Sequence, residues 1–281
     1  MDDLHAINAE INRRAGRKLL PSIAVSLSLV AIVWSTLAFR RELFAVLVVI
    51  AVSLGIREIA RAFAHAGTPI SMAALVIATA GLTIATWQGG AGGLAVATAV
   101  FLPLLLIDLL RAGPEGFVSR ATATTLSLIY LPFLAGFLIL LARPADGLTR
   151  VMTFVILVGS NDTFGYFVGV LFGKHPMAPK ISPKKSWEGL IGSIVFTVIA
   201  GELSFFYILH LKWWIGACVG LMVVFTATCG DLIESAMKRD LSLKDMGSLL
   251  PGHGGMLDRL DSVLLTAPAL WLALELVNRY I

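Results

Sequence analysis

The chain has 281 residues, of which 57% are hydrophobic and 14% are charged, and its formal net charge is +4. Soluble domains are about half apolar and about a quarter charged, so this composition excludes an ordinary soluble protein. The apolar excess falls in long runs with few charges, which predicts an all-α polytopic membrane protein. Membrane proteins are often basic because their cytoplasmic loops collect Lys and Arg, so the charge does not indicate a nucleic-acid partner and we expect none.

The first 18 residues are polar and end on Arg17 and Lys18, directly before an apolar run. This run is about 20 residues long, which is enough to cross a bilayer. We therefore interpret it as a retained first helix rather than as a signal peptide.

Apolar stretches of this kind recur along the chain and predict about nine transmembrane helices. Their expected bounds, each uncertain by about 2–4 residues, are 19–38, 42–57, 70–88, 92–111, 125–143, 151–172, 189–210, 213–237 and 262–279. We expect about five N-terminal helices in residues 1–145 and about four helices of a catalytic part in residues 146–281. Two charge-rich cytoplasmic loops, 173–188 and 238–261, belong to the second part.

The distribution of basic residues orients these helices. With the N-terminus in the cytoplasm, sixteen of the 22 Lys and Arg residues fall on the cytoplasmic side, as the positive-inside rule requires. These are Arg13, Arg14, Arg17, Lys18, Arg57, Arg61, Arg111, Arg120, Lys174, Lys180, Lys184, Lys185, Lys238, Arg239, Lys244 and Arg259. The others are Arg40, Arg41, Arg143, Arg150, Lys212 and Arg279. Nine helices then place the C-terminus outside, and we expect a multi-pass protein of the cell inner (cytoplasmic) membrane.

The loop between the sixth and seventh expected helices reads GKHPMAPKISPKKSWEG, from Gly173 to Gly189. It carries several lysines and three prolines that stiffen it. Ammonium groups on a constrained loop suit a polyphosphate or a lipid phosphate. Cytoplasmic loops also collect lysines for topological reasons, so charge alone leaves both interpretations open.

Carboxylates also occur inside the expected helices. Asp162 lies in the middle of the sixth helix, and Asp231 and Glu234 lie near the end of the eighth. A carboxylate within a membrane span is a candidate for function. The spacing of Asp231, Glu234 and Lys238 places them on one helix face. The alternative is a structural pair between Lys238 and one of these two acids.

The segment HGGMLDRLD, from His253 to Asp261, precedes the last expected helix. A helix that begins here would direct free N–H groups toward an anion. Asp258 and Asp261 would share one face of it, and Mg²⁺ prefers one or two carboxylates together with substrate phosphates. Helix capping could account for one of these acids. Together with the lysine loop, the segment predicts a metal-dependent phosphate site at the cytoplasmic membrane face.

The stretch from Ser235 to Asp261 closely resembles the signature of the phosphatidate cytidylyltransferases, also called CDP-diacylglycerol synthases. The matching residues are Ser235, Lys238, Arg239, Lys244, Asp245, Gly247, His253, Gly254, Gly255, Asp258, Arg259 and Asp261. The segments NDTFGYFVGVLFGKH and SPKKSWEG resemble two further motifs of the family. Ser186 stands where Thr is usual, and Phe164–Gly165 stands where Gly-Ala is common, which puts close packing there in question. The resemblance covers about residues 150–281.

This resemblance implies that CTP and phosphatidate are condensed to CDP-diacylglycerol and pyrophosphate, with Mg²⁺, by an all-helical membrane protein. The attack on the α-phosphorus of CTP would be in line. A related CTP-dependent lipid enzyme remains the alternative, either a polyprenol kinase or a cytidylyltransferase for another lipid phosphate, and a transporter is a more distant one. The expected partners are CTP, phosphatidate and membrane lipid. A homodimer, a second metal ion and a monovalent cation are left open.

The expected site residues follow from the motifs. We assign catalytic roles to Asp231, Asp258, Asp261, Lys238, Arg239 and His253. We assign substrate binding to Lys180, Ser182, Lys184, Lys185, Ser186, Asp162, Lys244 and Arg259. Asp231 and Asp258 are the expected Mg²⁺ ligands. His253 either donates to a phosphate or shapes the glycine-rich turn.

Overall fold

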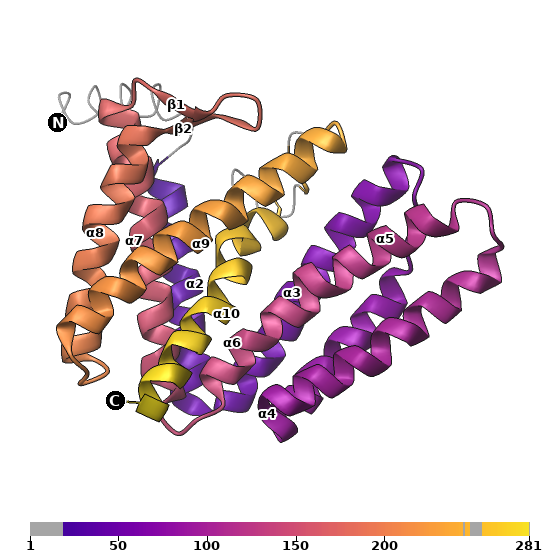
Figure 1. Ribbon diagram of the computed structural model, residues 1–281, viewed down its shortest axis with the longest axis horizontal. Coiled ribbons are helices and arrows are strands. Elements are labelled where there is room, and N and C mark those ends of the chain that lie inside the picture. The colour runs from indigo at the N-terminus through magenta and orange to yellow at the C-terminus, as the bar shows by residue number, and fades with distance from the viewer. Residues whose placement is uncertain (1–18, 244, 248–254, 281) are drawn as a thin grey trace.

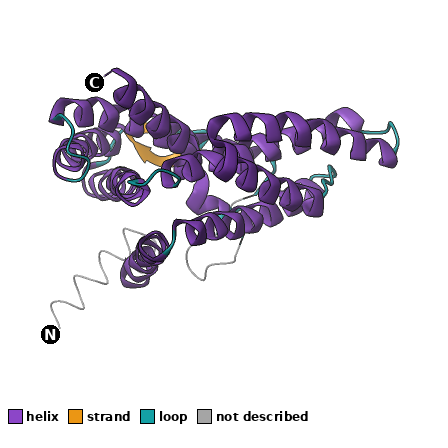
Figure 2. Cartoon of the chain, turned by 90° about the horizontal axis from the view of Figure 1, so that it is seen from below, coloured by secondary structure: helices purple, strands orange, loops and turns teal. Residues whose placement is uncertain are grey.

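The computed structural model describes residues 19–243, 245–247 and 255–280, and nearly all of them are helical (Figures 1 and 2). The helices are α2 (Leu19–Phe39), α3 (Arg41–His65), α4 (Met72–Leu109), α5 (Phe117–Leu128), α6 (Leu134–Ala142), α7 (Gly147–Phe172), α8 (Trp187–Tyr207), α9 (Trp213–Asp240) and α10 (Leu257–Tyr280). A short 3₁₀ turn, Leu110–Ala112, follows α4, and a π-helical turn, Ile129–Phe133, joins α5 to α6. The expected all-α class is confirmed, apart from one small β hairpin.

Seven helical stretches of the described chain are long and apolar enough to cross a membrane. They are Arg41–His65, Met72–Ala112, Phe117–Ala142, Gly147–Phe172, Trp187–Tyr207, Trp213–Asp240 and Leu257–Tyr280. Large apolar side chains such as Ile77, Val96 and Phe225 point outward, which suits contact with lipid. The chain is therefore a polytopic membrane protein.

Helix α4 reverses direction at Gly90, where φ is 63° and ψ is −145°. A Cβ atom added at Gly81 would collide with the ring of Phe101, although a straight helix would hold these residues about 30 Å apart. The two halves of α4 therefore lie side by side and antiparallel (Figure 1). The expected helices 70–88 and 92–111 fall on these two halves.

Arginine side chains connect this turn to the ends of neighbouring helices by hydrogen bonds. Arg143 donates from Nε to the carbonyl of Trp87 at 2.8 Å and from Nη2 to that of Gln88 at 3.2 Å. A cation at the end of a helix satisfies carbonyl groups that lack an intrahelical partner. Arg41 donates in turn to the carbonyl of Arg143 at 2.7 Å. The turn of α4, the start of α3 and the end of α6 therefore lie at one end of the bundle.

The segment from Phe117 to Ala142 forms one membrane-length path, although we expected a helix only from residue 125. Its first turns carry Arg120 and several threonines, so their hydropathy is low and an apolar run does not reveal them. Pro132 has no N–H group and lies in the π-helical turn that keeps the path continuous.

Helices α7 to α10 pack through small residues. A Cβ atom added at Gly201 on α8 would collide with the carbonyl of Gly216 on α9, and one at Gly230 on α9 with the carbonyl of Asp261 on α10. Glycines at such contacts let membrane helices approach closely. Helix α10 also contacts α3 and α6 of the N-terminal part. This packing brings the start of α10 next to the end of α9.

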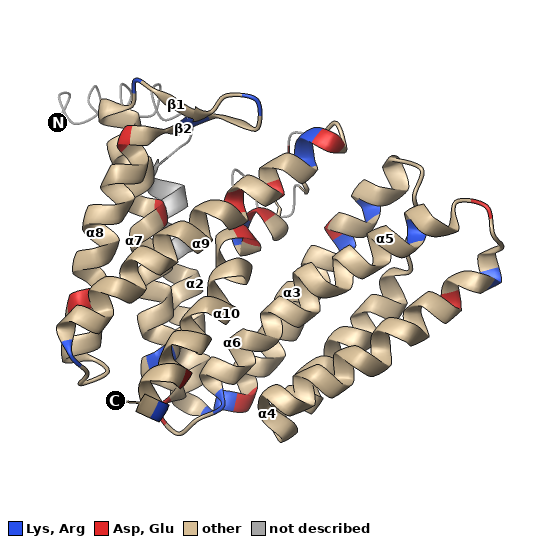
Figure 3. Cartoon of the chain, viewed as in Figure 1, with Lys and Arg blue, Asp and Glu red and all other residues tan. Residues whose placement is uncertain are grey.

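The lysine loop contains two short antiparallel strands, β1 (Pro176–Ala178) and β2 (Ser182–Ser186). Trp187 N donates to the carbonyl of His175 at 3.0 Å and closes this hairpin onto the start of α8. The hairpin lies between the end of α7 and the start of α8, on the side where α9 ends (Figure 1). Charged residues gather near the two ends of the molecule, except for one cluster on α7, α9 and α10 (Figure 3).

Candidate functional site

The last turns of α9 carry the polar face that the residue spacing predicts. Glu234 is fully buried, with 0% of its side chain exposed, and it forms an ion pair with Lys238 one turn later. A buried carboxylate is costly unless a cation compensates it. The structural pair considered as the alternative role for Lys238 is therefore present.

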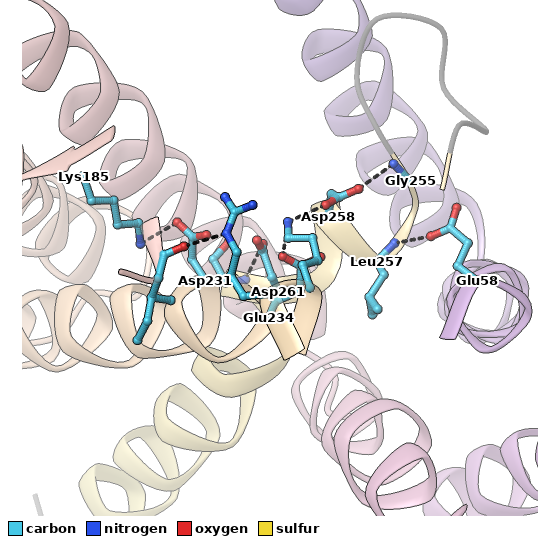
Figure 4. A network of polar contacts seen from close by, with 12 residues as sticks. Glu58, Lys185, Asp231, Glu234, Gly255, Leu257, Asp258 and Asp261 are labelled. Atoms are coloured by element: carbon cyan, nitrogen blue, oxygen red, sulfur yellow. Dashed lines mark hydrogen bonds and ion pairs between the residues drawn. The ribbon is translucent and has the colours of Figure 1, made fainter. Parts of the chain in front are cut away.

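Lys238 also joins α9 to α10. Its Nζ atom donates to Oδ1 of Asp258 at 2.7 Å, and Oδ2 of Asp258 accepts from the backbone N–H of Gly255 at 2.7 Å. Figure 4 shows Asp258 beside Gly255, with a dashed line for the hydrogen bond between them. The Lys238 ammonium and the Gly255 N–H group thus orient the two oxygens of this carboxylate.

The lysine hairpin reaches the same region. Lys185 forms an ion pair with Asp231 at 2.5 Å between nitrogen and oxygen. Arg239 donates from Nε to the carbonyl of Ile181 at 3.2 Å. These two contacts attach the hairpin to α9, so two segments about 50 residues apart in sequence contribute basic groups to one site (Figure 4).

A third helix adds Asp162. Its Oδ1 atom accepts from Asn161 at 2.9 Å, and its Oδ2 atom accepts from Ser262 on α10 at 3.1 Å. Asp261 accepts from its neighbour Ser262 N at 2.6 Å and lies within electrostatic range of Asp231 and Asp162. Three acids from α7, α9 and α10 therefore face one region.

The oxygen chemistry of this cluster fits Mg²⁺, a hard cation that binds carboxylates and phosphate oxygens. Crowded carboxylates repel one another, so a divalent cation among them would be stabilised. Yet in residues 19–243, 245–247 and 255–280 no three His, Cys, Asp or Glu side chains form a group that could hold a metal ion. The expected ligands Asp231 and Asp258 each contact a lysine instead. Mg²⁺ binding stays a prediction.

The remaining expected residues differ in their surroundings. Lys180 and Lys184 are exposed on the hairpin, and Ser182 and Arg259 are half-buried. Ser186 accepts from Gly189 N at 3.1 Å and caps the start of α8. Thr would supply the same hydroxyl, which explains why Ser is tolerated there. Lys244 and His253 lie outside the described residues.

The Phe164–Gly165 pair, which stands where Gly-Ala is common in the family, does not loosen the packing. A Cβ atom added at Gly165 would collide with Oγ of Ser193 on α8, so α7 and α8 are in close contact there. Phe164 stacks on Phe196 of α8 with ring centroids 3.9 Å apart. The Phe-Gly pair therefore supports close approach of these helices.

A contact from α3 to the start of α10 was not expected from the sequence. Glu58 of α3, which is 3% exposed, accepts hydrogen bonds from Met256 N and Leu257 N at 2.9 and 2.8 Å. The expectation of free N–H groups at the start of α10 is therefore wrong for these two residues and for Gly255, whose N–H binds Asp258. We expected the second helix to end at residue 57, so Glu58 fell just outside it. The useful signal was the apolar periodicity that continues to Phe63.

Comparisons with known proteins identify the family that this chain resembles. The model of a family described as the cytidylyltransferase family matches residues 22–277. A phosphatidate cytidylyltransferase of Mycobacterium bovis is 38% identical over 277 residues, which cover 94% of this chain and 90% of that protein. One of Mycobacterium leprae is 39% identical over 280 residues, with the same coverage of each chain. One of Staphylococcus haemolyticus is 38% identical over 136 residues, or 48% of this chain and 52% of that protein.

Proposed function

The chain belongs to the cytidylyltransferase family, and from this membership we propose that it condenses CTP with phosphatidate to give CDP-diacylglycerol and pyrophosphate. The mycobacterial relatives that carry the name phosphatidate cytidylyltransferase match over nearly their whole length. One structural observation carries the proposal further. Basic groups of the hairpin and of α9 meet acids from α7, α9 and α10 in one cluster.

In the proposed reaction a phosphatidate oxygen attacks the α-phosphorus of CTP. A new P–O bond forms on the face opposite the leaving group, and the bond between the α- and β-phosphates breaks to release pyrophosphate. A phosphate monoester is already anionic near neutral pH, so the main barrier is repulsion between two anions. Catalysis then rests on in-line positioning and on cations placed around the phosphates.

The basic residues of the cluster supply those cations. Lys184, Lys185, Lys238 and Arg239 would bind phosphate oxygens, and the hydroxyl of Ser182 would add a contact. Lys185 and Lys238 already lie beside acids of the cluster. The same ammonium groups can therefore turn to phosphates that bind next to those acids.

Asp231 and Asp258 are the proposed Mg²⁺ ligands, supported by Asp261 and Asp162. When bound, Mg²⁺ would withdraw charge from the phosphates of CTP. The carboxylates of this chain would hold and orient the ion, and the N–H of Gly255 would keep Asp258 in position. A second metal ion or a monovalent cation remains compatible with this number of acids.

The proposed topology has nine membrane spans, with the N-terminus in the cytoplasm and the C-terminus outside. Helix α2 and the two halves of α4 account for the difference from seven membrane-length stretches. The hairpin and the end of α9 would then face the cytoplasm, where CTP is available. The proposed location is the cell inner membrane.

Purified protein with labelled CTP, phosphatidate and Mg²⁺ tests this function. We expect CDP-lipid and pyrophosphate in equal amounts. Release of CDP together with a lipid monophosphate would indicate a lipid kinase instead. Binding of CTP without turnover of phosphatidate or of other lipid phosphates would overturn the proposal.

A further inference from the structure

Glu58 connects the N-terminal part of the chain to the catalytic segment. It lies on α3, and its two carboxylate oxygens accept from different backbone groups at the start of α10, Oε1 from Met256 N and Oε2 from Leu257 N. Almost 200 residues separate the partners in sequence. Figure 4 shows Glu58 beside Leu257 and Gly255, on the far side of Asp258 from Asp231.

As in every helix, the first N–H groups of α10 have no intrahelical acceptor. Three consecutive N–H groups are satisfied by two carboxylates. Asp258 accepts from Gly255, and Glu58 accepts from Met256 and Leu257. Glu58 therefore fixes the two backbone units that separate Gly255 from Asp258, the residues whose mutual contact orients the Asp258 side chain.

Glycines make room for this carboxylate. A Cβ atom added at Gly255 would lie 2.5 Å from Oε2 of Glu58, and one added at Gly247 would collide with the same carboxylate. Both glycines match positions of the family signature. Their lack of a side chain allows Glu58 to approach the backbone on both sides of the stretch between them.

We propose that Glu58 is a positioning residue that holds the start of α10, and through it the Asp258 carboxylate, for the reaction proposed above. Glu58 acts on the backbone of residues 256 and 257, and Asp258 continues the contact to Lys238. Its loss should misplace Asp258 while the hairpin lysines stay in place. The inference rests on the proposed function for its catalytic consequence, but not for the contact itself.

Glu58→Gln tests the contact with little change in shape. Gln replaces one of the two accepting oxygens with an NH₂ group that donates, so one of the two N–H groups loses the atom that now accepts its hydrogen bond. Glu42→Gln is the matched control, because Glu42 is an exposed acid at the opposite end of the same helix. We expect hydrogen exchange at Met256 or Leu257 to rise about tenfold or more in Glu58→Gln only, since one of these two amides loses a buried acceptor.

The kinetic result should separate positioning from simple stabilisation. We expect kcat for CDP-lipid synthesis to fall about 10- to 100-fold in Glu58→Gln, as misplacement of a reacting group does. KM for CTP should stay within about threefold, because the binding lysines are untouched. The thermal unfolding temperature in detergent, measured alongside, should stay close to that of the wild type. Unchanged exchange at residues 256 and 257, or unchanged kcat, would overturn the inference.

A second route covers the case in which Glu58→Gln folds poorly. Gly247→Ala leaves the acid intact but occupies its space, whereas Glu58→Ala removes the acid. If the two share one site, the double variant should be no worse than Glu58→Ala alone. Fully additive losses would overturn the inference. The exchange measurement needs no substrate, so an inactive wild type would contradict the proposed function while the Glu58 contact is still decided.

Discussion

Lys238 has two acidic partners, one fully buried and one partly buried, and it is the cation that compensates both of them. Glu234 on its own helix is fully buried, and Asp258 on α10 is 13% exposed. Removing one partner of a buried ion pair leaves the other charge uncompensated, which costs more than the pair contributes. Lys238 therefore has a structural function besides the phosphate contact that we propose.

We expect Lys238→Met to destabilise the protein by about 3–5 kcal/mol, the cost of breaking a buried ion pair. Thermal unfolding of the detergent-solubilised protein measures this. Lys212→Met is the control, because Lys212 is an exposed lysine directly before the start of α9. Equal unfolding temperatures for both variants would show that the two acids do not depend on Lys238.

Asp258→Asn keeps the shape of the side chain and removes its charge. Because Asp258 is a proposed Mg²⁺ ligand beside the reacting phosphates, we expect CDP-lipid synthesis to fall about 100-fold or more while the protein still folds. Asp240→Asn, an exposed position at the end of α9, should retain activity. Activity of Asp258→Asn close to that of the wild type would rule out the metal-ligand assignment.

At the level of elements, the hairpin β1–β2 determines where the loop lysines lie. Strand pairing directs Lys185 toward α9, and the contact from Arg239 to the carbonyl of Ile181 holds the hairpin at its other end. A Lys-rich cytoplasmic loop is expected on topological grounds alone. The ion pair with Asp231 shows that at least one of these lysines belongs to the acid cluster.

We expect Lys185→Ala to raise KM for CTP about tenfold with little effect on expression, because one phosphate contact is lost while Arg239 still holds the hairpin. Steady-state kinetics with varied CTP measure this change. Lys174→Ala removes an exposed lysine from the same loop and should leave KM unchanged. Identical kinetics for both variants would show that the loop lysines only orient the protein in the membrane and do not bind CTP.

At the level of the whole molecule, the reversal at Gly90 decides the number of membrane crossings. A straight α4 would be about 57 Å long, far more than the hydrocarbon thickness of about 30 Å. Two antiparallel halves match that thickness and place the turn beside Arg41 and Arg143. This division raises the seven membrane-length stretches to eight, and helix α2 supplies the ninth proposed span.

Accessibility of single cysteines tests the topology. In a background in which Cys218 and Cys229 are replaced, Gln88→Cys should react with a membrane-impermeant thiol reagent from outside intact cells. Ala66→Cys, in the connection between α3 and α4, should react only after the membrane is opened. Both native residues are exposed, so burial does not decide the result. Protection of residue 88 on both sides would contradict the turn.

The sequence predicted much of this architecture because helix positions depend on hydropathy, which is a local property. The expected helices 70–88 and 92–111 flank Gly90, and the expected helix 213–237 lies within α9. The early start of α5 was missed because its first turns are polar, and the strands of the hairpin were missed because they are short. Both depend on contacts that a local window does not include.

The candidate site was predictable to the extent that it follows helical periodicity. Spacing placed Glu234 and Lys238 on one face, and the family signature singled out Asp258 and Lys185. The partners of these residues were not predictable. Asp231 binds a lysine from the hairpin, and Met256 binds an acid from α3, because the packing of separate helices brings them together.

By itself, then, the sequence determined the membrane class, the approximate helices, the polar face of α9 and the family resemblance, since these depend on composition, periodicity and short motifs. Only the tertiary structure decided that Lys238 bridges two acids, that the hairpin meets α9, and that Glu58 holds the start of α10. The physical reason is that these contacts form between segments about 20 to 200 residues apart. Close helix packing at residues such as Gly230 brings these segments together.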